Sequence, residues 1–240
     1  MLRSIKQLYG DKLGALDGEI GRVKNVYFDD QHWAVRYVVV DTGSWLPGRQ
    51  VLISPHAFGS LAQTGPVLRV NLIRKQIENS PGIESHQPVS RQYEEEYYRY
   101  YGWPIYWQGD ALWGMSSFPI LELPPKVLPD EPVSASVSQP ERADALLRSA
   151  QAVNGYHLQA SDATAGYVRD FMMDVQSWAI RQLVIKTGHR FSGKEVEIPT
   201  RTVDRISWEE SKVFVNLTKE AVEQSPAHPV SPFSAGARHR

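Results

Sequence analysis

The sequence contains no cysteine among its 240 residues. This absence excludes disulfide bonds, thiolate metal sites and cysteine nucleophiles, and it is typical of proteins kept in a reducing compartment. No stretch approaches the roughly 18 apolar residues that a membrane-spanning helix needs. Residues 1–10 also lack the apolar core of a signal peptide. We therefore expect a cytoplasmic location.

Charge of one sign is not in excess, because 26 basic residues accompany 27 acidic ones and the formal net charge is −1. No overall field then draws the chain to nucleic acid or to an anionic membrane. We expect no nucleic-acid partner and no transmembrane segment, while peripheral association with a membrane stays open.

Known catalytic and metal-binding patterns are missing as well. No two of the seven histidines have the i, i+4 spacing of a helical metal pair, and no Gly-x-Ser-x-Gly elbow or nucleotide fingerprint occurs. The densest carboxylate group, Glu94–Glu95–Glu96, is expected on the solvent face of a helix. We predict a protein that is not an enzyme and has no catalytic, cofactor or metal site.

An internal repeat is the clearest positive signal. Gly166 follows Gly21 by 145 positions (166 minus 21), and the other matches keep this offset over about 70 residues, which favours a duplicated domain. The matched pairs include Asp29 and Asp174, Trp33 and Trp178, Arg36 and Arg181, Thr42–Gly43 and Thr187–Gly188, Gly48 and Gly193, Ile53 and Ile198, and Ser80–Pro81 and Ser225–Pro226.

Each repeat is rich in short β-branched and aromatic runs between turn residues, which is typical of a small barrel or sandwich. The predicted fold class is mainly β, with two small β-barrels related by duplication and joined by an aromatic-rich helix and a proline-rich linker. The first repeat is expected to have strands at 20–28, 34–40 and 51–53, a hairpin with arms 57–61 and 67–72 around a turn at 63–66, and a helix at 73–79. The second is expected to open at 155–158 and to have strands at 167–174 and 179–185, and a helix at 218–224.

The predicted domain boundaries follow changes in composition. We expect a first barrel at 1–81, an aromatic-rich helical and irregular segment at 82–120, a proline- and serine-rich linker with a short helix (141–152) at 121–154, a second barrel at 155–226, and a disordered tail at 227–240.

Three repeated residue types have predicted roles. Gly21 and Gly166 are expected at a bulge or barrel corner. Trp33 and Trp178 are expected to fill the barrel cores, with a ligand platform as the alternative, so that Trp33→Ala would cost about 3–5 kcal/mol. Arg36 and Arg181 stand beside the apolar central strand, where each could bind an anion, face solvent or pair with a local carboxylate.

The middle segment carries the candidate partner-binding residues. Tyrosines at i, i+4, i+7 and i+8 predict an amphipathic helix that begins after Ser90 and ends at Gly102 and Pro104. So many aromatic rings need burial, either against the chain's own barrels or against another protein, and we favour a homo-oligomer or partner surface. The candidates are Tyr93, Tyr97, Tyr100, Tyr101, Trp103, Tyr106, Trp107 and Trp113.

The run Leu13-x-Ala15-x-Asp17-Gly18-x-Ile20-Gly21, the strand to Asp29, the valine-rich strand ending in Asp41–Thr42–Gly43 and the strand ending in Ser54–Pro55 together resemble the PRC-barrel family. This barrel occurs in the photosynthetic reaction-centre H subunit and in the ribosome-maturation factor. The resemblance covers roughly 10–81 and 155–226. It implies six-stranded barrels and an adaptor-like role with no shared catalytic residue, and tandem members are often linked to stress responses.

Three functional hypotheses follow. The preferred one is a non-enzymatic scaffold or adaptor that assembles with itself or with another protein, in a stress-related role. The second is a small-ligand-binding module with a site between the barrels. The third is an accessory to membrane-bound photosynthetic electron transfer.

Overall fold

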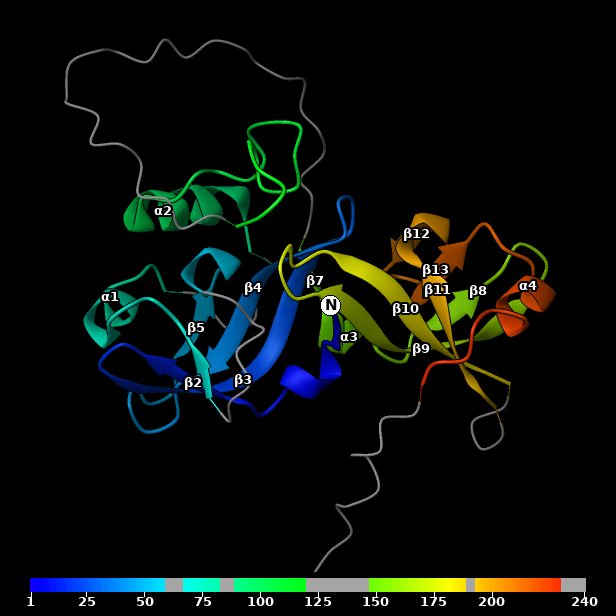
Figure 1. Cartoon of the computed structure of the whole chain (residues 1–240), viewed down its shortest axis with the longest axis horizontal. Coiled ribbons are helices and arrows are strands. Elements are labelled where there is room, and N and C mark those ends of the chain that lie inside the picture. The colour runs from blue at the N-terminus through cyan, green and yellow to red at the C-terminus, as the bar shows by residue number, and fades with distance from the viewer. Residues whose placement is uncertain (59–66, 83–88, 120–146, 189–192, 230–240) are drawn as a thin grey trace, which may run out of the picture. The chain divides into compact units, whose positions relative to one another are not determined.

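The computed structural model describes residues 1–58, 67–82, 89–119, 147–188 and 193–229 (Figure 1). The fold is mainly β, with two separate sheets. The chain forms two compact units, which we describe one at a time. The first comprises Met1–Gln151 and Met173–Ala179, and the second comprises Ala152–Met172 and Ile180–Arg240.

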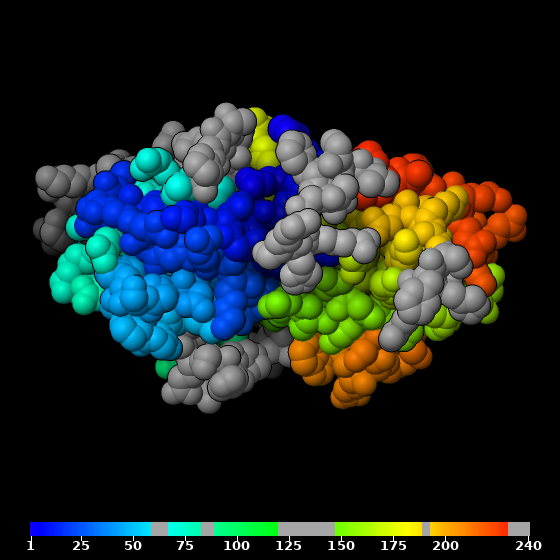
Figure 2. Space-filling view, turned by 90° about the horizontal axis from the view of Figure 1, so that it is seen from below, coloured from blue at the N-terminus to red at the C-terminus, as the bar shows by residue number. Residues whose placement is uncertain are grey.

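The sheet of the first unit has the strand order β5-β4-β3-β2-β6, with β7 paired to β3. Its centre is the antiparallel pair of β3 and β4, where the predicted long strands at 20–28 and 34–40 are confirmed. Val26, Val35 and Val40 are among the fully buried core residues. The strands of this sheet are β2 (Lys12–Ala15), β3 (Gly18–Asp29), β4 (Ala34–Asp41), β5 (Gln50–Ile53), β6 (Val67–Arg69) and β7 (Arg148–Ser149). The short strand β1 (Leu2–Ser4) also belongs to the first unit but not to this sheet. Figure 2 shows residues of its N-terminal strands, in blue, at the surface of this unit.

The first unit also contains several short helices. The predicted helix at 73–79 is confirmed as α1, and the middle segment contains α2. The predicted strand arm at 57–61 is wrong at its start, because Pro55 fixes a helical turn that ends at Ala57. Phe58 does pair with Val70 of the opposite predicted arm, while residues 59–61 and the turn at 63–66 lie outside the described residues. The helices are η1 (Lys6–Leu8), η2 (Pro55–Ala57), α1 (Arg74–Glu78) and α2 (Arg91–Tyr101).

The sheet of the second unit has the strand order β11-β10-β9-β8-β13-β12. The predicted strands at 167–174 and 179–185 are confirmed as β9 and β10, and the predicted helix at 218–224 is confirmed as α4. The elements are α3 (Ala150–Val153), β8 (His157–Gln159), β9 (Thr164–Asp174), β10 (Ile180–Thr187), β11 (Glu195–Pro199), η3 (Thr200–Thr202), β12 (Val203–Ser207), β13 (Lys212–Val215) and α4 (Lys219–Glu223).

The predicted helix at 141–152 is wrong at Arg148–Ser149 and confirmed only at its end, where α3 covers residues 150–152. Arg148 and Ser149 form β7 against β3, because Arg148 Nε donates to Asp30 Oδ2 at 2.7 Å and Ser149 Oγ accepts from Asn25 Nδ2 at 2.8 Å. Only the short helix α3 follows. Residues 141–146, most of the proline-rich linker and the end of the predicted tail lie outside the described residues.

Neither sheet closes into a barrel within the described part of the chain, so the predicted closed barrels are not seen. In the first unit the end of β5 bonds to a side chain instead of a strand: Tyr97 Oη donates to Leu52 O and accepts from Ser54 N. In the second unit β11 forms a bridge from Val196 to Ala227. Such contacts occupy backbone groups at the edges of each sheet, and these groups would have to pair with another strand to close a barrel.

Positions 145 apart make matching contacts in the two units. Asp17 Oδ1 accepts from Arg74 N at 2.8 Å, and Asp162 Oδ1 accepts from Lys219 N at 2.8 Å. The backbone pairs Gly10–Val23 and Gly155–Val168 are bonded in the same direction, as are Asn71–Ala57 and Asn216–Thr202. Gly21 and Gly166 have φ of 148° and 149°, and a Cβ atom at either would collide with backbone atoms of the neighbouring strand.

The turn before each central strand is built in the same way. Asp29 Oδ1 accepts from the amides two and three residues on, and so does Asp174 Oδ1, which confirms their turn-forming role. Each turn ends in a tryptophan with a positive φ, 54° at Trp33 and 58° at Trp178. This backbone conformation is unusual for a bulky side chain.

No helix in the described ranges is both long and apolar enough to cross a bilayer.

Candidate functional site: a buried polar cluster under an aromatic cover

The aromatic cover, residues 89–119, begins with α2. Ser90 Oγ accepts from Tyr93 N at 3.2 Å, which confirms the predicted N-cap. Gly102 ends the helix with a φ of 70°, a conformation that glycine adopts without a Cβ penalty. Tyr97 and Tyr98 lie on the buried face of the helix.

The cover packs on β4, β5 and η2 of its own unit, and Figure 1 shows α2 beside the end of the sheet that contains β4 and β5. The Tyr37 ring of β4 meets the Tyr97 and Tyr98 rings edge-on, with centroids 5.3 and 6.4 Å apart. Beyond the helix, the Trp113 ring meets the His56 ring edge-on at 5.0 Å. The aromatic cover therefore completes the core of the first unit on one side of its sheet.

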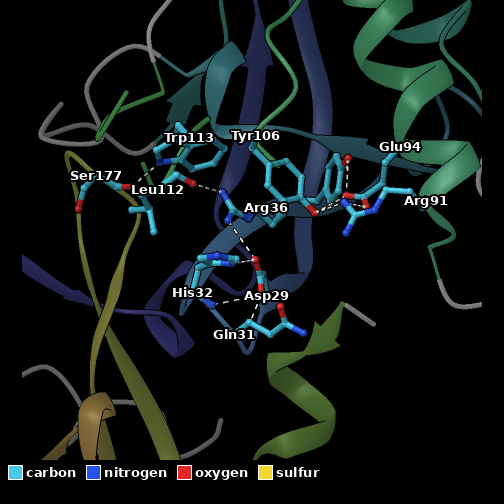
Figure 3. A network of polar contacts seen from close by, with 11 residues as sticks. Asp29, Gln31, His32, Arg36, Arg91, Glu94, Tyr106, Leu112, Trp113 and Ser177 are labelled. Atoms are coloured by element: carbon cyan, nitrogen blue, oxygen red, sulfur yellow. Dashed lines mark hydrogen bonds and ion pairs between the residues drawn. The ribbon is translucent and has the colours of Figure 1, made fainter. Parts of the chain in front are cut away.

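The cover also wraps around Arg36, a β4 side chain that is 1% exposed (Figure 3). The Arg36 guanidinium lies 3.7 Å from the Tyr106 ring centroid and 4.9 Å from that of Trp113. Its Nη1 donates to Leu112 O at 2.7 Å, and Trp113 Nε1 donates to Ser177 O at 2.8 Å. These cation–π contacts and hydrogen bonds fix the irregular part of the cover.

Arg36 pairs with the turn-forming Asp29, which confirms the predicted alternative of a local carboxylate. Arg36 Nη2 lies 3.0 Å from Asp29 Oδ2, and His32 Nδ1 lies 2.8 Å from the same oxygen. Burial alone would raise the pKa of Asp29, but the His32 hydrogen bond and the Arg36 charge hold it well below its ordinary value. The matched Arg181 is exposed.

Glu94 is buried, so the prediction that it lies on a solvent face is wrong. It is 1% exposed, and its Oε1 accepts from Tyr106 Oη at 2.9 Å and from Tyr37 Oη at 3.1 Å. Its Oε2 pairs with Arg91 Nη1 at 3.1 Å. Desolvation raises the pKa of Glu94 to about 7, although Arg91 and the two tyrosine hydroxyls oppose the rise.

We call Asp29, Arg36, Tyr37, Arg91, Glu94 and Tyr106 the polar cluster. Its two cations and two carboxylates balance when Glu94 is ionised. The whole cluster belongs to the first unit.

His56 lies beside the polar cluster and is fully buried. Its Nδ1 is 3.2 Å from Ser54 Oγ, and its ring stacks on Trp103 at 5.6 Å. Desolvation, followed by the charge of Arg36, lowers the pKa of His56 to about 4. The imidazole is therefore neutral at physiological pH.

The structure separates the eight predicted partner-binding residues into two groups. Tyr97, Tyr106 and Trp113 are buried within their own unit, so they are not free for a partner, because the sheet and Arg36 already cover them. The other five keep exposed surface, which is 41% for Tyr100 and partial for Tyr93, Tyr101, Trp103 and Trp107. We call these five residues the outer aromatic face.

Sequence reasoning missed Tyr37, Tyr98, Glu94 and His56. A signal for Glu94 was present, since it precedes Tyr97 and Tyr98 by three and four positions and so shares their helix face. His56 and Tyr37 gave no such signal, because their surroundings come from a segment distant in the chain.

Among the described residues, no three or more side chains of histidine, cysteine, aspartate or glutamate are grouped to hold a metal ion. No protein-family model matches the sequence, and no curated protein matches it.

The two buried titratable groups predict a pH dependence of stability. Glu94 has a folded pKa above its unfolded value near 4.5. Its contribution to the free energy of unfolding is therefore complete below pH 4.5 and is lost as the pH rises to about 7. His56 has a folded pKa below its unfolded value near 6.5, so its contribution is lost as the pH falls from 6.5 towards 4. As the pH rises from about 4.5 to 6.5, Glu94 lowers the stability of the fold while His56 raises it.

Substituting Glu94→Gln isolates the first effect, since the amide oxygen can still accept from the tyrosine hydroxyls. We expect the melting temperature of the variant, relative to the wild type, to rise as the pH is raised from 4.5 to 7 and then to level off. Thermal denaturation at several pH values measures this difference. The exposed Glu95→Gln serves as the control, and a pH-independent difference for Glu94→Gln would contradict the prediction.

Proposed function

We propose that this protein is a non-enzymatic adaptor that binds another protein through the outer aromatic face, with a second copy of the chain as the first candidate. The observation that carries the proposal is the partial exposure of five tyrosine and tryptophan residues on one folded segment. Tyrosine, tryptophan and arginine are enriched at protein interfaces and dominate their binding energy.

The rings of this face are held in place before any partner arrives. Tyr101 and Trp103 stack with centroids 4.4 Å apart and planes 11° apart. The Arg91 guanidinium lies 4.1 Å from the Trp107 ring centroid, and Tyr100 Oη donates to Gln76 O at 2.9 Å. A preorganised surface loses less conformational entropy on binding, which favours affinity.

We further propose that the two units are PRC-barrel-type domains related by duplication. The matching contacts at Asp17 and Asp162, the equivalent glycines at 21 and 166, and the similar tryptophan turns support this proposal. Such domains imply an adaptor role, as the sequence resemblance does. The ligand-binding and electron-transfer hypotheses stay predictions.

Substituting Tyr100→Glu tests the adaptor function. Tyr100 is 41% exposed, so a carboxylate at this position should cost the fold little stability. In an interface, however, the carboxylate would lose its hydration, which weakens binding. We expect light scattering to give an oligomer for the wild type and a smaller species for Tyr100→Glu. Trp208→Glu is the matched control, because Trp208 is 59% exposed in the second unit and should leave the oligomer intact.

A wild-type monomer at high concentration would exclude self-assembly and leave a heterologous partner. Affinity capture with the full chain then decides, because a true partner is retained by the wild type and by Trp208→Glu but lost by Tyr100→Glu. Equal capture by all three proteins would refute the outer aromatic face as the binding surface.

A further inference from the structure

Two tyrosine hydroxyls share one oxygen of a buried carboxylate in the polar cluster. Tyr37 of β4 and Tyr106 of the aromatic cover both donate to Glu94 Oε1, and Figure 3 shows Tyr106 beside Glu94. Packing does not need this arrangement, since burying a charged group is costly and an apolar side chain could fill the site. The adaptor function does not use it either.

The arrangement has a distinct chemical capacity. A phenol that loses an electron becomes strongly acidic, so its oxidation is easiest where a base already accepts its proton across a hydrogen bond. Glu94 is such a base. Its raised pKa, about 7, means that it takes a proton more readily than an ordinary carboxylate.

We propose that Tyr37 and Glu94 form a one-electron redox site. A diffusible one-electron oxidant removes one electron from Tyr37, and the O–H proton moves to Glu94 Oε1. The products are a neutral tyrosyl radical, a neutral carboxylic acid and the oxidant reduced by one electron. An electron from a one-electron reductant and the return of the proton restore the starting state.

Tyr37 is favoured over Tyr106 by electrostatics. The Arg36 guanidinium lies 3.7 Å from the Tyr106 ring centroid, where a cation stabilises the electron-rich ring and opposes removal of an electron. Tyr37 instead packs against the neutral rings of Tyr97 and Tyr98. Of the two tyrosines, Tyr37 is therefore the one that forms the radical.

A line of tyrosines joins this site to the surface. Ring centroids are 4.8 Å apart from Tyr100 to Tyr101, 4.9 Å from Tyr101 to Tyr97 and 5.3 Å from Tyr97 to Tyr37. Tyr100 and Tyr97 donate to the backbone carbonyls of Gln76 and Leu52, which do not take up a proton. An electron vacancy created at Tyr100, which is 41% exposed in the single chain, can pass inward and is trapped where a carboxylate accepts the proton.

Photo-oxidation of the full chain tests the proposal, with ruthenium tris-bipyridine as the photosensitiser and persulfate as the electron acceptor. Freeze-quenched samples are read by electron paramagnetic resonance. We expect a tyrosyl radical in the wild type, with about a tenfold lower yield in Tyr37→Phe and in Glu94→Gln, because the donor or the proton acceptor is removed. Tyr106→Phe should keep the signal.

Tyr156→Phe is the matched control, since Tyr156 is also buried but lies in the second unit, next to Trp208. It should leave the signal unchanged. If Glu94→Gln fails to fold, Tyr37→Phe alone decides, because it leaves Arg91 and Tyr106 on Glu94. A Tyr37→Phe signal equal to that of the wild type in amplitude and line shape overturns the proposal.

Discussion

Replacing Arg36 with methionine is expected to lower the free energy of unfolding of the first unit by about 3–5 kcal/mol, because it leaves a buried carboxylate without its partner. Asp29 is 2% exposed, and of its two ion-pair partners only the half-exposed His32 would remain. The substitution also removes the cation that Tyr106 and Trp113 surround and the donor to Leu112 O. Guanidinium denaturation measures the change.

Arg181→Met is the matched control, because Arg181 lies 145 positions later on β10 (181 minus 36) and is exposed. Its expected effect is within about 0.5 kcal/mol, as for most surface substitutions. The double variant Asp29→Asn/Arg36→Met separates charge from packing. The amide introduced by Asp29→Asn would keep the turn-forming oxygen, so the double variant should recover part of the stability that Arg36→Met loses. If the double variant recovers no stability, the loss in Arg36→Met comes from packing and not from the unpaired carboxylate of Asp29.

The contrast between Arg36 and Arg181 shows where sequence reasoning ends. The repeat places both arginines at the same point of the central strand, and the structure agrees. Their surroundings differ because residues 103–113 wrap around Arg36, and its bond to Leu112 joins positions 76 apart in the chain. Periodicity and spacing describe local backbone preferences, and they carry no information on which distant segment covers a strand.

Local patterns did predict the strands and helix ends. The valine-rich run at 34–40 became β4, and Ser90 and Gly102 cap α2 as their residue types favour. The face of Glu94 was misjudged because three successive glutamates suggest solvent, whereas the 3.6-residue period places the first of them beside Tyr97 and Tyr98. The closed barrel was expected from strand count, but a tyrosine side chain takes up the end of β5.

Truncating Trp178 to alanine is expected to be as damaging as losing Arg36, at about 3–5 kcal/mol, because a fully buried tryptophan leaves a large cavity. Trp178 is 1% exposed, and its ring lies 5.0 Å from that of Phe58. Its carbonyl also accepts from Val35 N at 2.9 Å, a backbone contact that alanine would keep. The loss of stability in Trp178→Ala should therefore come from removal of the indole ring alone.

The core position predicted for both tryptophans is confirmed for Trp178 and is wrong for Trp33, for which the loss of about 3–5 kcal/mol was expected. Trp33 is half-buried and stacks on Phe28 at 5.6 Å, so Trp33→Ala should cost roughly 1–2 kcal/mol. Both tryptophans have the same positive φ region, so alanine meets the same backbone strain at either position and the comparison isolates burial. Denaturation of the two variants side by side measures the difference. Equal losses would mean that the tryptophan turns contribute through their backbone, since the two rings differ in burial while the turns do not.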